Sequence, residues 1–271
     1  MKENIGIIAG GGQFPRLVAK DAHDAGMGVF ICGFQGHTDP STADSADVFQ
    51  LLHLGQLNRM IQFFREHGVR RVCMAGSINK PRALEFRPDW RAAKIVLSLR
   101  SKGDDSLLRA IIAELEKDGL SVVSSADLAP GLRCPAGVLT RRAPSEEVWK
   151  DIRYAWPIAR TMGSYDIGQC LVVRQGMVMA VECLEGSDAA IKRGAELGGE
   201  GCTAVKMVKP GQDERVDLPS IGLTTIRNLV SLRYAALAIH AGKTLFFDRE
   251  EALALADENG LSIVALNDDF S

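Results

Sequence analysis

Apolar residues in the first 125 positions form short runs that alternate with segments of helical spacing. A strand-like run at 5–9 is followed by a helix-like segment at 14–25 and then by 28–32, 57–67 and 71–75, which read as strand, helix and strand. Strands that alternate with helices in this way are typical of βαβ units on a parallel sheet. The pattern therefore predicts an α/β domain with a parallel sheet in the first part of the chain.

A longer amphipathic segment closes this first region. Its apolar positions recur at the spacing of one helical face over 104–117 and are Leu107, Leu108, Ile111, Ile112 and Leu115. A strand is expected over 121–124, after which prolines and glycines accumulate over 126–144. Because Pro and Gly interrupt regular structure, this stretch predicts an interdomain connection. We therefore expect two domains, at 1–130 and 131–271.

The second half begins with a helix and a hairpin. Ser145 precedes two acidic residues, which is typical of a helix start with a serine cap. Strand-like runs at 170–173 and 177–183 flank Gln175 and Gly176, a pair that suits the tight turn of a β-hairpin. The topology of this region therefore differs from that of the first domain.

The remaining apolar runs predict a second α/β domain. Alternation over 204–209 predicts a strand that ends at Pro210 and Gly211, and the long apolar run at 224–240 carries helical spacing. Further strands are expected at 245–247 and 263–266. The fold class is thus α/β, with a parallel-sheet domain followed by a second, distinct α/β domain.

Charge and cysteine content restrict the class of protein. The formal net charge is −2, whereas nucleic-acid binding needs a basic face or stripe, so no nucleic-acid partner is expected. The six cysteines form no CxxC pair and no zinc-ligand spacing, and they are expected to be reduced thiols of a cytosolic protein. No signal-peptide pattern opens the sequence and no apolar run reaches about 18 residues, so no membrane-spanning segment is expected.

A glycine loop follows the first predicted strand. Gly11, Gly12 and Gln13 lead into a helix start, a geometry that presents backbone N–H groups to a phosphate. These residues are candidate nucleotide contacts, with a tight structural turn as the alternative. An NAD site would also need an acidic residue after the second strand, but residues 32–36 are Cys-Gly-Phe-Gln-Gly. NAD binding is therefore the weaker interpretation.

Two further loops carry candidates of the same kind. Gly76, Ser77 and Lys80 follow the strand at 71–75, and open α/β sheets bind ligands at such carboxyl ends. Lys102, Gly103 and Asp104 precede the amphipathic helix. Lys102 is a candidate phosphate partner, whereas Asp104 also suits a plain helix N-cap. A loop without ligands is the alternative interpretation of both segments.

Lysines and carboxylates accumulate over 206–217. Lys206 and Lys209 are followed by Asp213, Glu214 and Asp217. Hard divalent cations are held by one or two carboxylates plus substrate phosphates, and lysines neutralise the remaining phosphate charge. The segment therefore suits metal-assisted phosphoryl chemistry. The alternative is a solvated loop in which an aspartate pairs with Arg215.

The predicted hairpin has carboxylates and glycines at both of its open ends. Asp166 and Gly168 precede its first strand, while Glu182, Gly186 and Asp188 follow its second. Glycine at a strand end allows another backbone to approach closely. These ends are further candidate binding segments, although Ser187 and Asp188 would also suit the cap of a following helix.

Six segments, taken in order, resemble one enzyme family. They are Ile-Ile-Ala-Gly-Gly-Gly-Gln-Phe-Pro at 7–15, Ala-Gly-Ser-Ile-Asn-Lys-Pro at 75–81, Lys-Gly-Asp-Asp-Ser-Leu-Leu-Arg at 102–109, Asp-Ile-Gly-Gln at 166–169, Glu-Gly-Ser-Asp at 185–188 and Arg-Val-Asp-Leu-Pro-Ser-Ile-Gly at 215–222. The series resembles the UDP-2,3-diacylglucosamine pyrophosphatase family of lipid A biosynthesis, the two-domain type unrelated to calcineurin-like phosphoesterases. Lys80 stands where the family has arginine, and Ser187 and Ser220 stand where it has threonine.

The resemblance implies Mg²⁺-dependent hydrolysis of UDP-2,3-diacylglucosamine to UMP and 2,3-diacylglucosamine 1-phosphate, with Mn²⁺ as an alternative cation. It implies a Rossmann-like nucleotide-binding domain, a C-terminal catalytic domain and substrate held between them. The family's essential aspartate corresponds to Asp217, as metal ligand or water-orienting group. The substrate-binding positions expected from motifs and resemblance together are Gly11, Gly12, Gln13, Gly76, Ser77, Lys80, Lys102, Gly103, Asp104, Asp166, Ile167, Gly168, Gln169, Glu185, Gly186, Asp188, Lys206, Lys209 and Arg215.

A lipid-linked UDP-sugar substrate sets further expectations. The protein should be cytoplasmic and at most peripheral to the inner membrane, with transient contact at the membrane surface; homodimer formation is left open. Two rival functions remain at this point. One is an NAD-linked oxidoreductase that uses the first glycine loop, and the other is a module that binds a UDP-sugar without catalysis.

Overall fold

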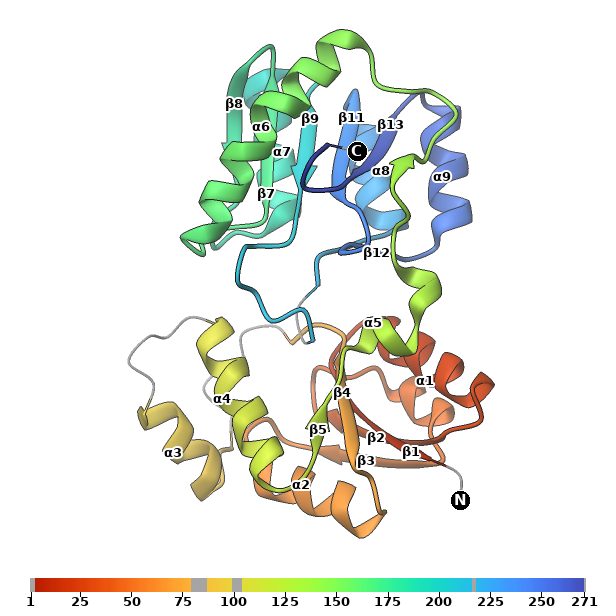
Figure 1. The fold of residues 1–271 in the computed structure, drawn as a ribbon, viewed down its shortest axis with the longest axis vertical. Coiled ribbons are helices and arrows are strands. Elements are labelled where there is room, and N and C mark those ends of the chain that lie inside the picture. Colours follow the sequence, from red (N-terminus) through yellow and green to blue (C-terminus); the bar gives the residue numbers. More distant parts are fainter. Residues whose placement is uncertain (1–2, 79–86, 99–103, 216–217, 271) are drawn as a thin grey trace. The chain divides into compact units, whose positions relative to one another are not determined.

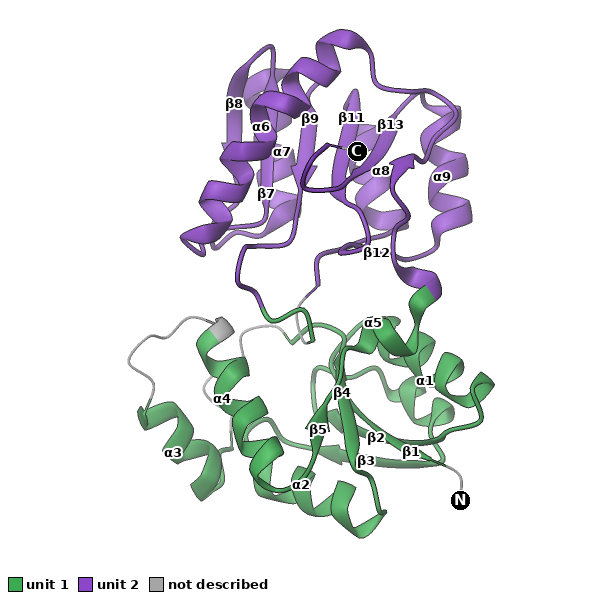
Figure 2. Cartoon of the chain, in the orientation of Figure 1, with its two compact units in different colours: residues 1–130, 213–217 green, residues 131–212, 218–271 purple. Residues whose placement is uncertain are grey.

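The computed structural model describes residues 3–78, 87–98, 104–215 and 218–270 of the chain (Figure 1). It divides into two compact units, coloured separately in Figure 2. The first unit comprises residues 1–130 and 213–217, and the second comprises 131–212 and 218–271. The sequence patterns predicted one continuous second domain, so the grouping of 213–217 with the first unit was not anticipated.

The sheet of the first unit has five parallel strands in the order β3-β2-β1-β4-β5. The strands are β1 (Asn4–Ala9), β2 (Gly28–Phe34), β3 (Val48–Leu52), β4 (Arg71–Ala75) and β5 (Ser121–Val122). Ile7 in the central strand pairs with Ile31 on one side and Cys73 on the other. The predicted parallel sheet is confirmed, although the patterns missed β3.

Helices pack on this sheet through their apolar faces. They are α1 (Phe14–Asp24), α2 (Leu57–Glu66), α3 (Trp90–Ser98), α4 (Asp104–Lys117) and α5 (Ser125–Leu128), with short 3₁₀ turns η1 (Pro40–Ser45) and η2 (Pro130–Leu132). Pro15 lies in the first turn of α1, where its missing N–H has no intrahelical partner to lose. The buried faces of α2 and α4 share one core with β2 and β4. Predicted helices at 14–25, 57–67 and 104–117 are confirmed within two residues.

The second unit contains a mixed sheet of six strands in the order β6-β13-β11-β9-β7-β8. The strands are β6 (Gly137–Val138), β7 (Cys170–Arg174), β8 (Met177–Val181), β9 (Thr203–Lys206), β11 (Ala236–His240) and β13 (Ser262–Leu266). Strands β9, β11 and β13 are parallel, whereas β7 is antiparallel to both of its neighbours. A second, distinct α/β topology is therefore confirmed.

The predicted hairpin of β7 and β8 is also confirmed. Gln175 and Gly176 both have positive φ, of 49° and 72°, as the two central residues of a type I′ turn require. The buried carboxylate of Asp151 accepts hydrogen bonds from both of their backbone N–H groups, at 2.9 and 2.7 Å. This carboxylate fixes the turn against helix α6 (Glu146–Ser164).

Helices cover both faces of the second sheet. They are α6 (Glu146–Ser164), α7 (Ser187–Gly198), α8 (Leu223–Ser231) and α9 (Arg249–Glu258), and a two-stranded sheet joins β10 (Ser220–Ile221) to β12 (Leu245–Phe246). Ile152 and Trp156 of α6 pack on one side with Ala238, while Leu237 and Ile239 belong to the core on the other side. Ser145 caps α6 by accepting from the Val148 N–H, as predicted.

Two predictions for the second half were wrong in part. The run at 224–240 is not one helix: α8 ends at Ser231, Arg233 turns the chain with φ of 54°, and β11 begins at Ala236. All five residues of β11 are buried, and a strand buried on both faces carries no alternation that would separate it from a helix. The strand expected to reach Pro210 ends at Lys206.

Over the ranges that the structure describes, we find no helix whose length and apolar character would suffice to span a bilayer.

Candidate functional site

All carboxyl ends of the five parallel strands lie at one edge of the first sheet. The chain leaves β1 through Gly10–Gly12 and leaves the adjacent β4 through Gly76 and Ser77. Strands β2 and β3 follow β1 on one side, and β4 and β5 lie on the other, so these two loops flank the point where strand order reverses. Open α/β sheets bind ligands at such a switch point.

The two glycine loops are joined by their backbones. Gly11 N–H donates to the Ser77 carbonyl at 2.7 Å, and Ser77 N–H donates to the Gly11 carbonyl at 3.2 Å. A Cβ on Gly10 would lie 2.6 Å from the Ser77 carbonyl oxygen, and one on Gly76 would lie 2.5 Å from that of Gly11. These glycines are therefore required by the packing of one loop on the other.

Gly12 has a different environment from its neighbours. Its φ is +83°, and a Cβ at this position would meet no atom within 4 Å. The space above its backbone is open, and the next residue, Gln13, is the N-cap of α1. Gly12 is thus the glycine of this loop at which a ligand has room to approach the main chain.

The polar segment 213–215 is fixed to the first unit by three side chains. Arg215 binds both carboxylate oxygens of Asp213, with Nε 2.9 Å from Oδ1 and Nη2 2.7 Å from Oδ2. Its Nη1 lies 2.9 Å from Oε1 of Glu116 at the end of α4. Ser124, just after β5, donates its hydroxyl to the Glu214 carbonyl at 3.3 Å.

This ion pair changes the acidity of both partners. The hydrogen bond from the Arg215 side chain lowers the pKa of Asp213, and the bond to Asp213 raises the pKa of Arg215. Asp213 therefore keeps its charge in mildly acidic solution, but Arg215 already occupies its oxygens. The aspartate–arginine pair that sequence analysis left as an alternative is present.

Four predicted site residues, Asp217, Lys80, Lys102 and Gly103, lie outside the described residues. Asp104 is the first residue of α4. Asp217 is two residues beyond Arg215, which is held in the first unit, and three residues before Ser220, which pairs with β12 in the second. The structure thus describes the residues that are held in place on either side of this position, Arg215 before it and Ser220 after it.

One edge of the second sheet collects the remaining candidates. The carboxyl ends of β8 and β9 lie at the same edge as the start of β7, because β7 runs antiparallel to both. Residues 166–169 precede β7, residues 182–188 follow β8, and Lys206 ends β9. The structure therefore brings three segments together that are separated in sequence.

Close backbone contact joins the first two of these segments. A Cβ on Gly168 would lie 2.2 Å from the Glu182 carbonyl oxygen, which confirms the close approach expected of this glycine. Asp166 adopts φ of 57° and pairs with Lys209, whose Nζ lies 2.5 Å from Oδ1. The neighbouring Ile167 is partly exposed.

Glu182 organises this edge, and the sequence analysis did not select it as a site residue. Its side chain is 8% exposed, and Oε2 accepts from the Ser187 hydroxyl at 2.9 Å and from the Gln169 N–H at 3.3 Å. The carboxylate thus links the segment before β7 to the start of α7. The only sequence signal was a carboxylate near the end of the predicted strand 177–183, within a candidate binding segment.

The start of α7 is built differently from the predicted serine or aspartate cap. Gly186 occupies the N-cap position with φ of 85°, and the Ser187 hydroxyl donates to Glu182 instead. Asp188 lies in the first turn and accepts from Asn228 at 3.4 Å. The backbone N–H of Glu185, followed by its hydrogen bond with Arg193, lowers the pKa of the Glu185 carboxyl.

Lys206 is an almost fully buried cation at the end of β9. Its side chain is 8% exposed, and Nζ donates to the Ser220 carbonyl at 2.9 Å. This bond ties β9 to β10, the strand that follows Asp217 in sequence. The adjacent Cys170 thiol is also buried, and burial raises its pKa to about 12, so it is not a nucleophile at neutral pH.

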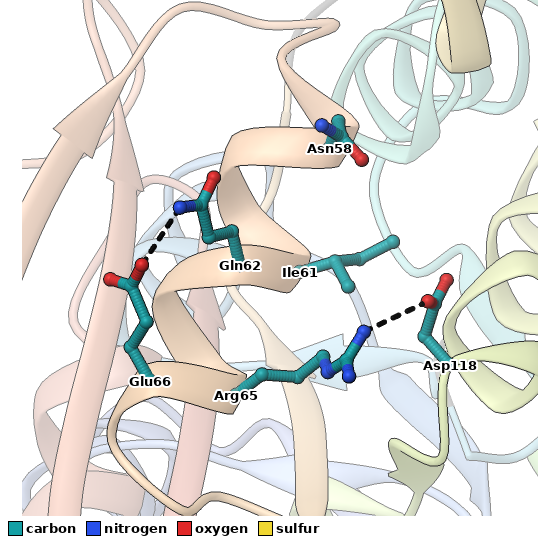
Figure 3. Close-up of a pocket in the computed structure, with 6 residues that line it drawn as sticks. All are labelled: Asn58, Ile61, Gln62, Arg65, Glu66 and Asp118. Carbon is teal, nitrogen blue, oxygen red and sulfur yellow. Dashed lines mark hydrogen bonds and ion pairs between the residues drawn. The ribbon is translucent and has the colours of Figure 1, made fainter.

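No group of three or more His, Cys, Asp or Glu side chains among the described residues is arranged to hold a metal. A surface hollow does occur, along α2 (Figure 3). It is lined by Asn58, Ile61, Gln62, Arg65, Glu66 and Asp118. Arg65 pairs with Asp118 at 3.5 Å across it, and none of the candidate residues lines it. The candidate residues therefore lie at the sheet edge of each unit and not at this hollow.

Solved structures of two other enzymes match part of this chain, with low sequence identity and low TM-scores. The biotin carboxylase domain of the Hydrogenobacter thermophilus 2-oxoglutarate carboxylase matches with 11% identity and a TM-score of 0.29, over 73% of this chain and 42% of that one. N5-carboxyaminoimidazole ribonucleotide synthetase in complex with ADP matches with 17% identity and a TM-score of 0.28, over 72% and 44%. The chain spans less than half of these proteins, and such similarity supports no functional inference.

Comparison with sequence-family models and with a curated relative shows which family the chain belongs to. The LpxI N-terminal domain model matches residues 4–132, and the LpxI C-terminal domain model matches residues 135–264. The UDP-2,3-diacylglucosamine pyrophosphatase LpxI of Caulobacter vibrioides is 35% identical over 277 residues, which cover 97% of both chains. The six motifs, the two units and these full-length matches agree, and the chain belongs to the LpxI family.

Proposed function

We propose that this chain hydrolyses the pyrophosphate bond of UDP-2,3-diacylglucosamine and releases UMP and 2,3-diacylglucosamine 1-phosphate. The observation that carries the proposal is the full-length similarity to the Caulobacter pyrophosphatase of that name. The candidate residues gathered at the two sheet edges support it, because they combine open backbone, cations and carboxylates.

The glycine loops of the first unit suit the nucleotide. Gly10 and Gly11 donate their N–H groups to Ala75 and Ser77, so these amides serve the loop pair itself. Contacts to the substrate are then left to the open backbone at Gly12 and to the exposed Ser77 side chain. A nucleotide diphosphate near the start of α1 is favoured by the positive end of the helix dipole.

The lysines of the second unit suit the diphosphate. Lys209 lies at the surface edge of the sheet and pairs with Asp166, an ion pair that a phosphate could replace. Lys206 is bound to the Ser220 carbonyl and is best placed to position the chain that leads back from Asp217. Phosphoryl transfer gains chiefly from positioning and charge neutralisation, so a covalent nucleophile is not required.

We assign Asp217 as the metal ligand or the group that orients the attacking water. The described carboxylates form no metal cage, which fits the mode in which Mg²⁺ is held by one or two carboxylates together with substrate phosphates. Mg²⁺ or Mn²⁺ bound in this way would neutralise charge on the diphosphate. Because the substrate is an amphiphile, we further propose that the protein acts at the cytoplasmic surface of the inner membrane.

UMP release from UDP-2,3-diacylglucosamine tests this function. The chain should release UMP in Mg²⁺, lose that activity on chelation with EDTA, and regain it when Mg²⁺ or Mn²⁺ is added back. Substrate that binds without UMP release would contradict hydrolysis and support a binding module. Full turnover after thorough metal removal would contradict the metal requirement alone.

A further inference from the structure

Helix α3 of the first unit presents large apolar side chains to solvent. Trp90 and Leu97 are each 84% exposed, and Val96 is 45% exposed. Large apolar residues that gather on one surface usually mark an interaction site. Seven residues separate Trp90 from Leu97, which places them within about 20° of each other around the helix. The exposed apolar face of α3, defined by Trp90 and Leu97, therefore lies along one side of the helix, and Val96 lies about 120° away from Trp90.

The opposite side of α3 is firmly attached to the unit. Ala92 and Ile95 are buried in its core. The Asp89 carboxylate accepts from the Ala92 N–H at 2.9 Å and from the Asn58 N–H at 2.6 Å, which fixes the start of α3 to that of α2. Figure 1 shows α3 on the outside of this unit, beside α2 and α4. Because the other side of α3 is packed in the core, the exposed apolar face is kept turned toward solvent.

The charges around this face are basic. Arg87 and Lys94 are exposed, and Lys94 lies about 40° from Trp90 around the helix. Of the neighbouring acids, Asp118 and Glu114 pair with Arg91 on the buried side, while Asp89 accepts from two backbone N–H groups and keeps its negative charge, so Arg87 and Lys94 together outweigh it by one charge. The surface at α3 therefore combines Trp90, Leu97 and Lys94 of the helix with Arg87, which lies just before it.

This combination identifies the class of partner. Tryptophan, aliphatic residues and lysine or arginine on one helix are typical of a segment that lies in a membrane interface, where anionic head groups attract the cations. A second copy of this chain fits less well, because a two-fold axis through the face would bring Lys94 and Arg87 of both copies together.

We propose that the exposed apolar face of α3 docks on an anionic lipid bilayer, with Arg87 and Lys94 at the head groups and Trp90 and Leu97 at the acyl boundary. This docking rests on the proposed function for its purpose, since it would hold the enzyme at the surface in which a diacylated substrate is embedded. Binding to lipid is nevertheless measured without substrate.

Vesicle flotation tests the docking directly. The wild-type chain should float with vesicles of phosphatidylglycerol and phosphatidylcholine, less so at high salt. The double variant Trp90→Ser/Leu97→Ser should lower the bound fraction about tenfold, because it removes most of the apolar area available for insertion. Leu184→Ser is the matched control, since Leu184 is 94% exposed in the second unit and should leave binding unchanged.

Tryptophan fluorescence adds a readout specific to this helix. Vesicles should shift the emission of the wild-type chain to shorter wavelength, and Trp90→Phe should bind as the wild type does yet lose that shift, because the other two tryptophans lie in the second unit, where Trp156 is buried and the half-buried Trp149 packs against the core. Equal flotation of the wild type and the double variant, or no flotation of the wild type, would overturn the proposal. Loss of self-association in the double variant without any lipid binding would assign the face to a second copy.

Activity separates this proposal from the proposed function. The double variant should cleave detergent-dispersed substrate at the wild-type rate and cleave vesicle-embedded substrate about tenfold more slowly. Equal losses in both forms would show a defect in the site and contradict docking. A wild-type chain that floats with vesicles but releases no UMP would refute the proposed function and leave the docking intact.

Discussion

The candidate edges of the two units are built on different physical bases. In the first unit, the loops after β1 and β4 are joined by backbone hydrogen bonds, and glycines such as Gly11 and Gly76 allow the two backbones to approach closely. In the second unit, buried side chains hold the edge, with Glu182 joining two segments and Lys206 joining β9 to β10.

This difference determines which substitutions each edge tolerates. Replacing a glycine can destabilise the fold in two ways: the new side chain can clash with its neighbours, or the backbone φ can be unfavourable for a residue with a Cβ. Each effect has its own cost in stability. Replacing a buried carboxylate destabilises the fold by weakening or removing the hydrogen bonds that its donors make. Four substitutions separate these modes, taken here from the largest expected effect to the smallest.

Gly168→Val should have the largest effect on stability. Its Cβ would lie 2.2 Å from the carbonyl oxygen of Glu182, and backbone cannot withdraw as a flexible side chain can. We expect a loss of roughly 3 kcal/mol or more in the free energy of unfolding. Urea denaturation of this variant beside Gly176→Ala, which meets no neighbour, measures it. Equal midpoints for the two variants would disprove the close approach.

Glu182→Gln should have an intermediate effect. The Gln169 N–H and the Ser187 hydroxyl both donate to the same oxygen, Oε2, and the variant keeps one oxygen there but removes the negative charge that strengthens both hydrogen bonds. We expect a loss of about 1–2 kcal/mol, measured by thermal unfolding. Glu196→Gln, on the exposed side of α7, is the control and should change the melting temperature little. A harmless Glu182→Gln would mean that the charge of this carboxylate does not contribute to holding the edge.

Gly12→Ala isolates the cost of backbone conformation. With φ of +83° and open space around its Cβ, the variant should lose only about 1 kcal/mol of stability. Gly26→Ala has almost the same φ, +78°, and equally open space, but Gly26 follows α1, away from the loop. If the nucleotide approaches Gly12, KM rises for Gly12→Ala and not for Gly26→Ala. An equal KM for both variants would remove Gly12 from the binding site.

Arg215→Gln should have the smallest effect, with a defined dependence on pH. Arg215 is partly exposed, so the pair contributes at most about 1 kcal/mol at pH 7. Asp213 has its pKa lowered below 3.8, so its stabilisation is present above that pH and is lost as pH falls through the folded-state pKa. The stability difference from wild type should therefore be constant in mildly acidic solution and shrink as the pH falls below about 3.8. A difference that grows in acid would contradict the ion pair.

Sequence patterns predicted the backbone-built edge better than the side-chain-built edge. Gly10–Gly12 before α1 reveals both a turn and a helix start, because glycine and proline impose local geometry. Glu182 and Lys206 act through partners 5–14 residues away that fold back from other elements, and no local spacing encodes those contacts. Strand β11 was hidden for a related reason, since burial on both faces removes the alternation that marks a strand.

Asp217 provides the most direct test of the central claim that this chain is a pyrophosphatase with its catalytic carboxylate after the segment 213–215. Single-turnover UMP release by Asp217→Ala should fall roughly a hundredfold or more, the scale expected when an electrostatic or acid–base group is lost. The melting temperature should match that of wild type and of Asp24→Ala, whose aspartate pairs with Lys20 at the surface. If Asp217→Ala does not fold, Asp217→Asn provides the same comparison. A folded Asp217 variant that releases UMP at the wild-type rate would contradict the account.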